Sequence, residues 1–379
     1  MSKKIVLAPD SFKESLTAKQ VCQALEAGLR QTLPDATFVH LPMADGGEGT
    51  VQSLVDATGG SLRVTTVDGP LGNPVDATWG LLGDGRTAVI EMAEASGLGL
   101  VDQTQRDPGR ATTRGTGQLL LAALDAGVSR VVLGIGGSAT NDGGAGFAQA
   151  IGARLLDANG AELQPGGAAL AHLDRVDASG MDPRLSEVTI EVACVVTNPL
   201  CGPNGASAVF GPQKGAGPET VAELDAALAH YARILARDLG RDVADLPGAG
   251  AAGGLGGGLV AFTGAELRRG VEIVIDVSGL RAVVGDADLV ITGEGRMDAQ
   301  SVMGKTPQGV AVVARAAGVP VVAVTGCLGD GFEALHEEGF SAIFPIIDRI
   351  ASLEDVLAEG ASNITRTARN VGAVLALTL

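Results

Sequence analysis

The sequence predicts an α/β protein in which both chain ends build one doubly wound parallel sheet and the middle of the chain forms an inserted α+β domain. Strand-like and helix-like segments alternate at the two ends, and a run of short strands without helices lies between them. The 379 residues, 46% of them apolar, exceed what one hydrophobic core usually supports. We therefore expect a discontinuous Rossmann-like domain, residues 1–60 and 285–379, and an inserted domain, residues 61–284.

The first sixty residues predict the order β-α-β-α. Ile5–Ala8 is a continuous apolar run, as expected for a strand that is buried on both faces. Thr17–Gln20 is a capping box that opens a helix with its apolar residues on one face. Thr37–Met43 predicts a second strand, which ends just before Asp45, and the following helix ends at Gly59.

The middle of the chain predicts an antiparallel meander followed by mixed elements. Turns too short for helices join the three meander strands, Leu62–Val67, Val75–Leu82 and Thr87–Ala93. The elements expected next are a helix, a strand, a second strand and a long helix: Gly117–Ala126, Arg130–Leu133, Val188–Val196 and Glu219–Leu239. The glycine-rich segment Gly248–Gly258 predicts either a mobile loop or the N-terminal nest of a helix.

From Asp286 onward the β-α alternation returns. Three strands are expected, Leu289–Thr292, Val319–Thr325 and Phe340–Pro345. Thr306 followed by Pro307 predicts an N-cap with proline at the first helical position, and a last helix should start at Ser352. Ligands of such sheets bind at the carboxyl ends of the strands, so the predicted site is a cleft that faces the insert. Those ends carry Asp10, Asp45, Glu294 and Gly326.

The charge balance excludes several classes of partner. Lys and Arg number 27 against 44 Asp and Glu, which gives a net charge of −17, and aromatic residues make up only 3%. Neither a basic footprint nor a stacking surface for nucleic acid is present, and an anionic membrane is an equally poor partner. Four cysteines without a C-x-x-C pair and an N-terminus without a signal or membrane-spanning segment predict a cytoplasmic protein.

An acidic residue beside paired glycines occurs twice, in the pattern Asp-Gly-Gly-x-Gly: Asp45–Gly49 and Asp142–Gly146. Glycine lets backbone N–H groups approach an anion, and a helix start adds partial positive charge. A carboxylate there would repel a bare phosphate, so the pattern points to phosphate with Mg²⁺, bound by Asp45 and Asp142. A tight turn with a helix cap is the alternative. A third acidic glycine loop, Gly293–Arg296, favours the phosphate interpretation.

Two familiar motifs nearly match and are rejected. Gly304-Lys305-Thr306 resembles the end of a P-loop, but position 299 is Ala where the first glycine should stand. Gly134–Ala139 fits G-x-G-x-x-A, with Asp157 near the place of a ribose-binding acid, which keeps an NAD-dependent dehydrogenase as an alternative. The segment Thr140–Gly144 argues against NAD binding, because it stands where the helix of a dinucleotide-binding motif should already have begun.

The titratable residues suit phosphoryl transfer. The four histidines lie outside the glycine-rich loops, so a carboxylate would act as general base. Basic residues in suitable loops could clamp anions, although Lys13 could simply be solvated and Arg296 could be held in an ion pair. These basic residues are Lys13, Arg114, Lys214, Arg296 and Lys305.

Five segments in order resemble the bacterial type-1 glycerate kinase family, across essentially the whole chain. They are Ala8–Ser15, Asp45–Thr50, Gly136–Gly144, Thr197–Gly202 and Gly293–Lys305. The resemblance implies ATP-dependent phosphorylation of D-glycerate at the 2-hydroxyl, with Mg²⁺, by a two-domain enzyme. A glycerate 3-kinase and a non-catalytic nucleotide-binding regulator stay open as alternatives, and the oligomeric state is left open, with a homodimer among the options.

The resulting hypothesis gives each candidate residue a task. Asp10 or Asp298 accepts the hydroxyl proton, Lys13 neutralises the transferred phosphoryl group, and Arg296 or Lys305 holds the glycerate carboxylate. Mg²⁺ is held by one or two of Asp45, Asp142 and Glu294. The nucleotide is held by Gly136, Gly137, Ser138, Asn141, Gly143, Gly144, Glu294, Ser301 and Lys305.

Overall fold

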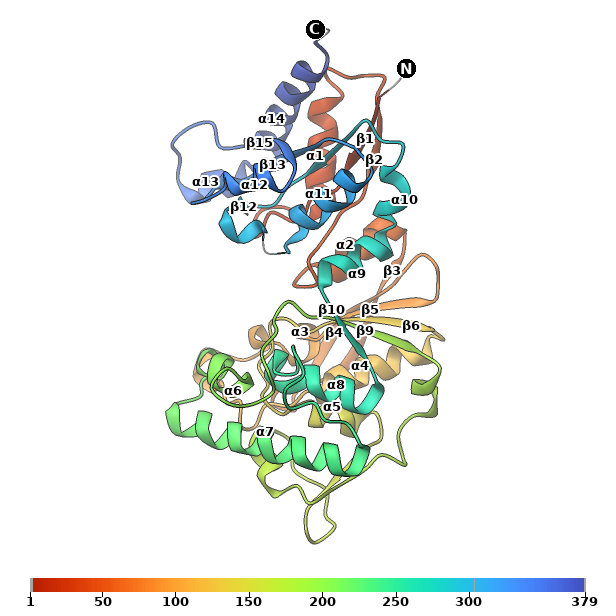
Figure 1. Ribbon diagram of the computed structural model, residues 1–379, viewed down its shortest axis with the longest axis vertical. Coiled ribbons are helices and arrows are strands. Elements are labelled where there is room, and N and C mark those ends of the chain that lie inside the picture. Colours follow the sequence, from red (N-terminus) through yellow and green to blue (C-terminus); the bar gives the residue numbers. More distant parts are fainter. Residues whose placement is uncertain (1–2, 303, 378–379) are drawn as a thin grey trace. The chain divides into compact units, whose positions relative to one another are not determined.

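The computed structural model describes residues 3–302 and 304–377, which form two compact units (Figure 1). Unit 1 consists of Met1–Asp45, Gln52–Gly59 and Val271–Leu379, and unit 2 of Gly46–Val51 and Gly60–Gly270. The predicted division into domains at 60/61 and 284/285 stays a prediction, and residues 271–284 belong to unit 1. Within the described residues, no helix has both the length and the apolar character needed to cross a bilayer.

Unit 1 is built on a five-stranded parallel sheet with the order β15-β13-β11-β1-β2. This confirms the predicted doubly wound sheet, because both chain ends contribute strands. The strands are β1 (Lys4–Leu7), β2 (Thr37–His40), β11 (Leu289–Thr292), β13 (Val321–Thr325) and β15 (Phe340–Pro345). A separate short parallel pair is formed by β12 (Arg296–Met297) and β14 (Cys327–Leu328).

Helices α1 (Ala18–Leu29), α11 (Thr306–Ala316), α12 (Ala334–Glu337) and α14 (Gly360–Leu375) pack against strands of the five-stranded sheet. The other helices that lie wholly or mostly in unit 1 are α2 (Thr50–Thr58), α9 (Gly270–Ser278), α10 (Leu280–Val284) and α13 (Leu353–Ala358). The predicted capping box of Thr17 and Gln20 is present at the start of α1. Helices α1 and α14 lie side by side (Figure 1), and Gly28 permits this because a Cβ there would stand 2.2 Å from the Thr365 carbonyl oxygen.

The order of strands changes direction between β1 and β11. The chain continues from β1 to β2 on one side, whereas β11, β13 and β15 extend the sheet on the other side. At this switch point the N–H of Asp10 donates to the carbonyl of Gly293 at 2.8 Å, so the loops after β1 and β11 are joined. Sheets of this kind bind ligands at such a position, outside the carboxyl ends of the strands.

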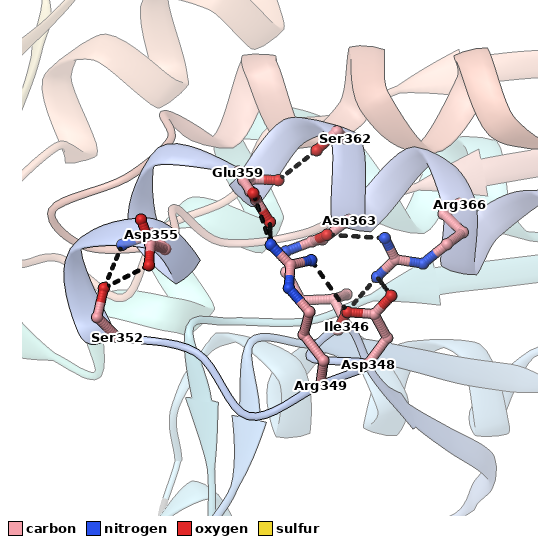
Figure 2. Close-up of polar contacts among 9 residues, drawn as sticks. All are labelled: Ile346, Asp348, Arg349, Ser352, Asp355, Glu359, Ser362, Asn363 and Arg366. Atoms are coloured by element: carbon pink, nitrogen blue, oxygen red, sulfur yellow. Dashed lines mark hydrogen bonds and ion pairs between the residues drawn. The ribbon is translucent and has the colours of Figure 1, made fainter.

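The connection after β15 forms two helices where one was predicted from Ser352. Ser352 does cap α13, but the helix ends before Glu359 and α14 begins anew. Figure 2 shows the ion pairs around this break: Arg349 donates to both carboxylate oxygens of Glu359 at 2.7 and 2.8 Å, and Arg366 pairs with Asp348 at 3.2 Å. Exposed pairs of this kind contribute about 0–1 kcal/mol each, so they fix the path of the segment more than they stabilise the unit.

Unit 2 contains a six-stranded mixed sheet with the order β10-β9-β6-β5-β4-β3. The meander β3-β4-β5 is antiparallel, as predicted, whereas β5, β6, β9 and β10 pair in parallel. The strands are β3 (Ser61–Asp68), β4 (Pro74–Leu81), β5 (Thr87–Glu91), β6 (Arg130–Gly134), β9 (Thr189–Ala193) and β10 (Glu266–Arg268), with a separate hairpin of β7 (Arg154–Leu156) and β8 (Arg175–Asp177).

Helices and a large apolar core complete unit 2. The helices are α3 (Ala93–Ser96), α4 (Arg114–Asp125), α5 (Ala145–Ala150), α6 (Ala206–Phe210), α7 (Pro218–Leu239) and α8 (Leu255–Thr263). The glycine-rich segment Gly248–Gly258 lies at the start of a helix, as one of its two predicted interpretations requires, whereas its use as an anion-binding nest stays a prediction. It leads into α8, and most of its residues are buried.

Candidate active site

The buried carboxylate of Asp142 organises the loop that follows β6 in unit 2. Its Oδ2 accepts hydrogen bonds from the N–H and the hydroxyl of Thr113, at 2.8 and 2.9 Å, and from the N–H of Gly146 at 3.1 Å. Its Oδ1 accepts from the N–H of Gly144 at 3.1 Å. Burial raises the pKa of Asp142, and these hydrogen bonds oppose the rise by favouring the charged form. The carboxylate therefore ties the start of α4 to the start of α5.

Glycines in and before α8 allow the same loop to pack backbone against backbone. A Cβ at Gly253 would lie 2.0 Å from the carbonyl oxygen of Thr140, and one at Gly258 would lie 2.4 Å from that of Gly143. Real side chains do not approach so closely. The glycine-rich segment is therefore needed for a close approach between α8 and the candidate phosphate loop, a purpose that sequence alone did not reveal.

The structure divides the predicted nucleotide-binding loop into an exposed and a buried part. Gly136 and Gly137 are exposed, whereas Asn141, Gly143 and Gly144 are buried. The N–H of Gly143 donates to the carbonyl of Gly253, and that of Gly144 donates to Asp142. The N–H groups of these two glycines thus have protein partners. The part of the loop that a phosphate could contact therefore runs from Gly136 to Ser138.

Glu91, which the sequence analysis missed, holds the first Asp-Gly-Gly loop. It is the last residue of β5, and its carboxylate accepts the N–H of Val51 at 2.8 Å and that of Gly49 at 3.4 Å. Burial raises the pKa of Glu91, and these two hydrogen bonds oppose the rise. An acidic residue at the carboxyl end of a buried strand was the signal that could have identified it.

In unit 1, Asp10 stands at the switch point of the sheet. Its Oδ2 accepts the Thr306 hydroxyl at 2.5 Å, and its Oδ1 accepts the N–H of Ser11 at 2.6 Å. Burial raises the pKa of Asp10 to about 7; Asp45 and Glu294 add to the rise by repulsion, and the two hydrogen bonds reduce it. The predicted capping role of Thr306 is wrong, because Lys305 is the N-cap residue of α11 and the Thr306 hydroxyl donates to Asp10.

Glu294 is the second carboxylate at this edge of unit 1. It accepts the Ser301 hydroxyl at 2.6 Å and lies 3.6 Å from the ammonium nitrogen of Lys305. Burial raises the pKa of Glu294, Ser301 and Lys305 lower it, and Asp45 raises it further by repulsion. Five predicted site residues, Asp10, Asp45, Glu294, Ser301 and Lys305, are therefore coupled within unit 1. Asp142 belongs to unit 2, and its gathering with Asp45 and Glu294 stays a prediction.

The cations predicted to hold the substrate lie at the surface of the same unit. Arg296 pairs with Asp298 at 3.2 Å, as the ion-pair alternative anticipated, while 64% of the Arg296 side chain stays exposed. Lys13 is exposed, and its backbone lies beside Gly295, where a Cβ would be 3.7 Å from the Lys13 nitrogen. Arg296, Asp298 and Lys13 thus border the carboxylate cluster through the loop 293–298.

The carboxylates suit Mg²⁺ only in one of its usual binding modes. Among residues 3–302 and 304–377, no group of three or more His, Cys, Asp or Glu side chains is arranged to hold a metal ion. Mg²⁺ in phosphotransferases is commonly held by one or two carboxylates together with phosphate oxygens. The electrostatic coupling of Asp45 with Asp10 and Glu294 fits that mode.

The geometry does not support a dinucleotide fingerprint after β6. Helix α5 starts only at Ala145, well beyond the G-x-G-x-x-A pattern that should open a helix. Asp157 turns its carboxylate onto the N–H groups of Asn159 and Ala161 in the turn after β7, a strand outside the main sheet. The residue proposed to bind ribose is thus used in a local turn.

Comparisons with known proteins agree with the fold and with the family that the sequence resembles. The sequence matches the profile of the glycerate kinase family over residues 5–376. It is 55% identical over 370 residues to a glycerate kinase of Halalkalibacterium halodurans, covering 98% of this chain and 97% of the relative. It is 53% identical over 374 residues to the glycerate 2-kinase of Escherichia coli, covering 99% and 98%.

A solved structure agrees as well. The crystal structure of a protein provisionally named glycerate kinase 2, from Salmonella typhimurium LT2, superposes on this chain with a TM-score of 0.93 at 55% sequence identity. The superposition covers 99% of this chain and 98% of the Salmonella chain. The chain belongs to the glycerate kinase family, which confirms both the resemblance and the α/β fold predicted from the sequence.

We expect Asp142→Asn to destabilise the protein by about 1–3 kcal/mol, because an amide nitrogen would face N–H donors in the interior. Thermal or urea unfolding without Mg²⁺ measures this. Asp157→Asn is the matched control, since it also accepts two backbone N–H groups but lies in a surface turn, where Asn serves as well as Asp. Equal, small effects of both substitutions would contradict the anchoring role of Asp142.

The raised pKa of Asp10 predicts a pH dependence of stability. The folded protein holds this proton up to about pH 7, whereas the unfolded chain releases it near the ordinary value of 3.8. The stabilisation is therefore complete below pH 3.8 and is lost as the pH rises through about 7. Asp10→Asn should flatten the fall in the free energy of unfolding between pH 5 and about 8. An unchanged slope, measured by urea unfolding at several pH values, would rule this out.

Proposed function

We propose that the protein transfers a phosphoryl group from ATP to the 2-hydroxyl of D-glycerate and so forms 2-phospho-D-glycerate and ADP. The observation that carries this proposal is the 53% identity to the glycerate 2-kinase of Escherichia coli over nearly the full length of both chains. The alignment covers 99% of this chain and 98% of the relative, so the identity applies to both units of the chain. The choice of the 2-hydroxyl over the 3-hydroxyl rests on the same relative.

The two units supply complementary chemistry for this reaction. Unit 2 offers exposed glycine backbone and Ser138, which suit the phosphates of a nucleotide. Unit 1 offers carboxylates with the cations Lys13, Arg296 and Lys305 beside them. In the proposal, Arg296 or Lys305 holds the glycerate carboxylate and Lys13 neutralises charge on the transferred group. The predicted position of the site in a cleft between the two domains stays a prediction.

Asp10 is the better of the two candidates for the general base. A base works best when its pKa lies near the working pH, and burial together with neighbouring carboxylates raises the pKa of Asp10 to about 7. Asp298 is ion-paired with Arg296, an arrangement that favours orientation of the guanidinium. Asp10 would accept the glycerate hydroxyl proton while the Thr306 hydroxyl holds its carboxylate in place.

Mg²⁺ would be held by Asp45, with Glu294 as the further candidate, and would supply charge neutralisation at the phosphate oxygens. Asp142, also predicted from the sequence as a ligand, is the weaker candidate, because its buried carboxylate already accepts four hydrogen bonds. A cytoplasmic location is part of the proposal, and the free thiols of all four cysteines suit a reducing compartment. The oligomeric state stays open, and so does the homodimer considered from the sequence.

The purified protein should release ADP from ATP when D-glycerate and Mg²⁺ are both present. A coupled ADP assay measures this, and the product should show the NMR signals of the 2-phosphate ester. A 3-phosphate ester would replace the proposal by the alternative regiochemistry. Nucleotide binding without turnover would favour the regulator, and reduction of NAD would favour the dehydrogenase.

We expect Asp10→Asn to lower kcat by about 10²–10⁴, because an amide cannot accept the hydroxyl proton, while KM changes little. Asp298→Asn is the matched variant. If Asp298 mainly orients Arg296, its replacement should raise KM for glycerate more than it lowers kcat. The opposite pattern, with a near-normal kcat for Asp10→Asn and a steep loss for Asp298→Asn, would transfer the role of base to Asp298.

A further inference from the structure

Lys214 is a buried lysine directly behind the exposed part of the candidate phosphate loop. Its side chain is only 2% exposed, and it follows α6 in a short turn within unit 2. The ammonium nitrogen donates to the hydroxyl oxygen of Ser138 at 2.7 Å and to the carbonyl oxygen of Thr140 at 2.7 Å. Among the described residues, no carboxylate lies within ion-pair distance of it.

A buried ammonium without a counter-ion is costly. Desolvation lowers the pKa of Lys214 to about 7, and the charge of Asp142 only partly opposes this effect. Asp142 does not serve as a contact partner, because its oxygens accept the hydrogen bonds of Thr113, Gly144 and Gly146. A methionine of similar length would fill the same space at lower electrostatic cost, so the position of a lysine here calls for an anion that compensates its charge.

The two contacts of Lys214 also prepare Ser138 to bind such an anion. Because the Ser138 oxygen accepts a hydrogen bond from the ammonium group, the hydroxyl proton of Ser138 is available for a further acceptor. Ser138 directly follows Gly136 and Gly137, the exposed glycines of the loop, in the chain. Lysine, serine and glycine backbone thus converge on the place where a phosphate would bind.

We propose that Lys214 is the positioning residue for the nucleotide phosphates: it orients Ser138 and the Thr140 backbone, and its charge is balanced when MgATP binds. This inference rests on the proposed kinase function and deepens it. The competing view is a purely structural clamp between the turn at 211–216 and the loop after β6. That clamp would affect folding, whereas the proposed role affects affinity for nucleotide.

The test compares Lys214→Met with wild type and with Lys19→Met, a control at an exposed lysine that pairs with Asp56. Calorimetric titration with MgADP should show at least tenfold weaker binding for Lys214→Met. KM for ATP should rise by a similar factor, KM for glycerate should stay within about twofold, and the melting temperature should be unchanged or higher. Lys214→Arg, which keeps the charge, should recover part of the affinity.

MgADP affinity within twofold of wild type in a folded Lys214→Met protein would overturn the inference. If that variant does not fold, Ser138→Ala decides, since it keeps the lysine and removes the hydroxyl: a severalfold loss of MgADP affinity supports the proposal and normal affinity overturns it. Glycerate-dependent ADP release by wild type together with normal binding by the variants would reject this role alone. Absence of that release in wild type would instead reject the kinase function.

Discussion

In unit 2, the loop between β6 and α5 and the start of α4 are held together by one buried carboxylate, that of Asp142. Among the residues that the structure describes, no cationic side chain forms an ion pair with Asp142, and backbone N–H groups and one hydroxyl take the place of a counter-ion. Such a carboxylate is stable in the interior only when the starts of α4 and α5 both point their N–H groups at it. The loop between β6 and α5 is consequently fixed at its buried end, while Gly136 and Gly137 stay at the surface. One desolvated side chain thus fixes the buried end of a glycine-rich loop.

The two units contain opposite electrostatic imbalances. In unit 1, Asp10, Asp45 and Glu294 repel one another, and Lys305 compensates only part of their charge. In unit 2, the ammonium group of Lys214 is buried, no carboxylate of the described residues lies within ion-pair distance of it, and the charge of Asp142 compensates it only in part. A divalent cation has the charge that compensates the carboxylates of unit 1, and a phosphate has the charge that compensates Lys214 in unit 2. A protein with a net charge of −17 cannot attract a phosphate by its overall field, which makes these local groups decisive.

Local patterns predicted the elements well, and long-range contacts explain what they missed. The apolar run at the start of the chain, the capping box and the meander all depend on neighbouring residues, and each was confirmed. Capping rules predict a helix cap at Thr306 because they use only neighbouring residues, whereas the hydrogen-bond partner of Thr306 is Asp10, which lies near the other end of the sequence. Lys214 lies among Gly and Pro, a context typical of an exposed turn, so its burial could not be predicted. The purpose of the glycines before α8 required knowledge of the loop against which they pack.

The discontinuity of unit 2 in the sequence has a consequence for dissecting the protein. Residues 60–270 are contiguous and hold the whole mixed sheet, so they look like a fragment that could be produced alone. Such a fragment would lack residues 46–51 and with them the N–H groups of Gly49 and Val51. Glu91 at the end of β5 would then lose both of these backbone donors. A version of unit 2 that is to fold alone therefore needs residues 46–51 as well, joined to residues 60–270.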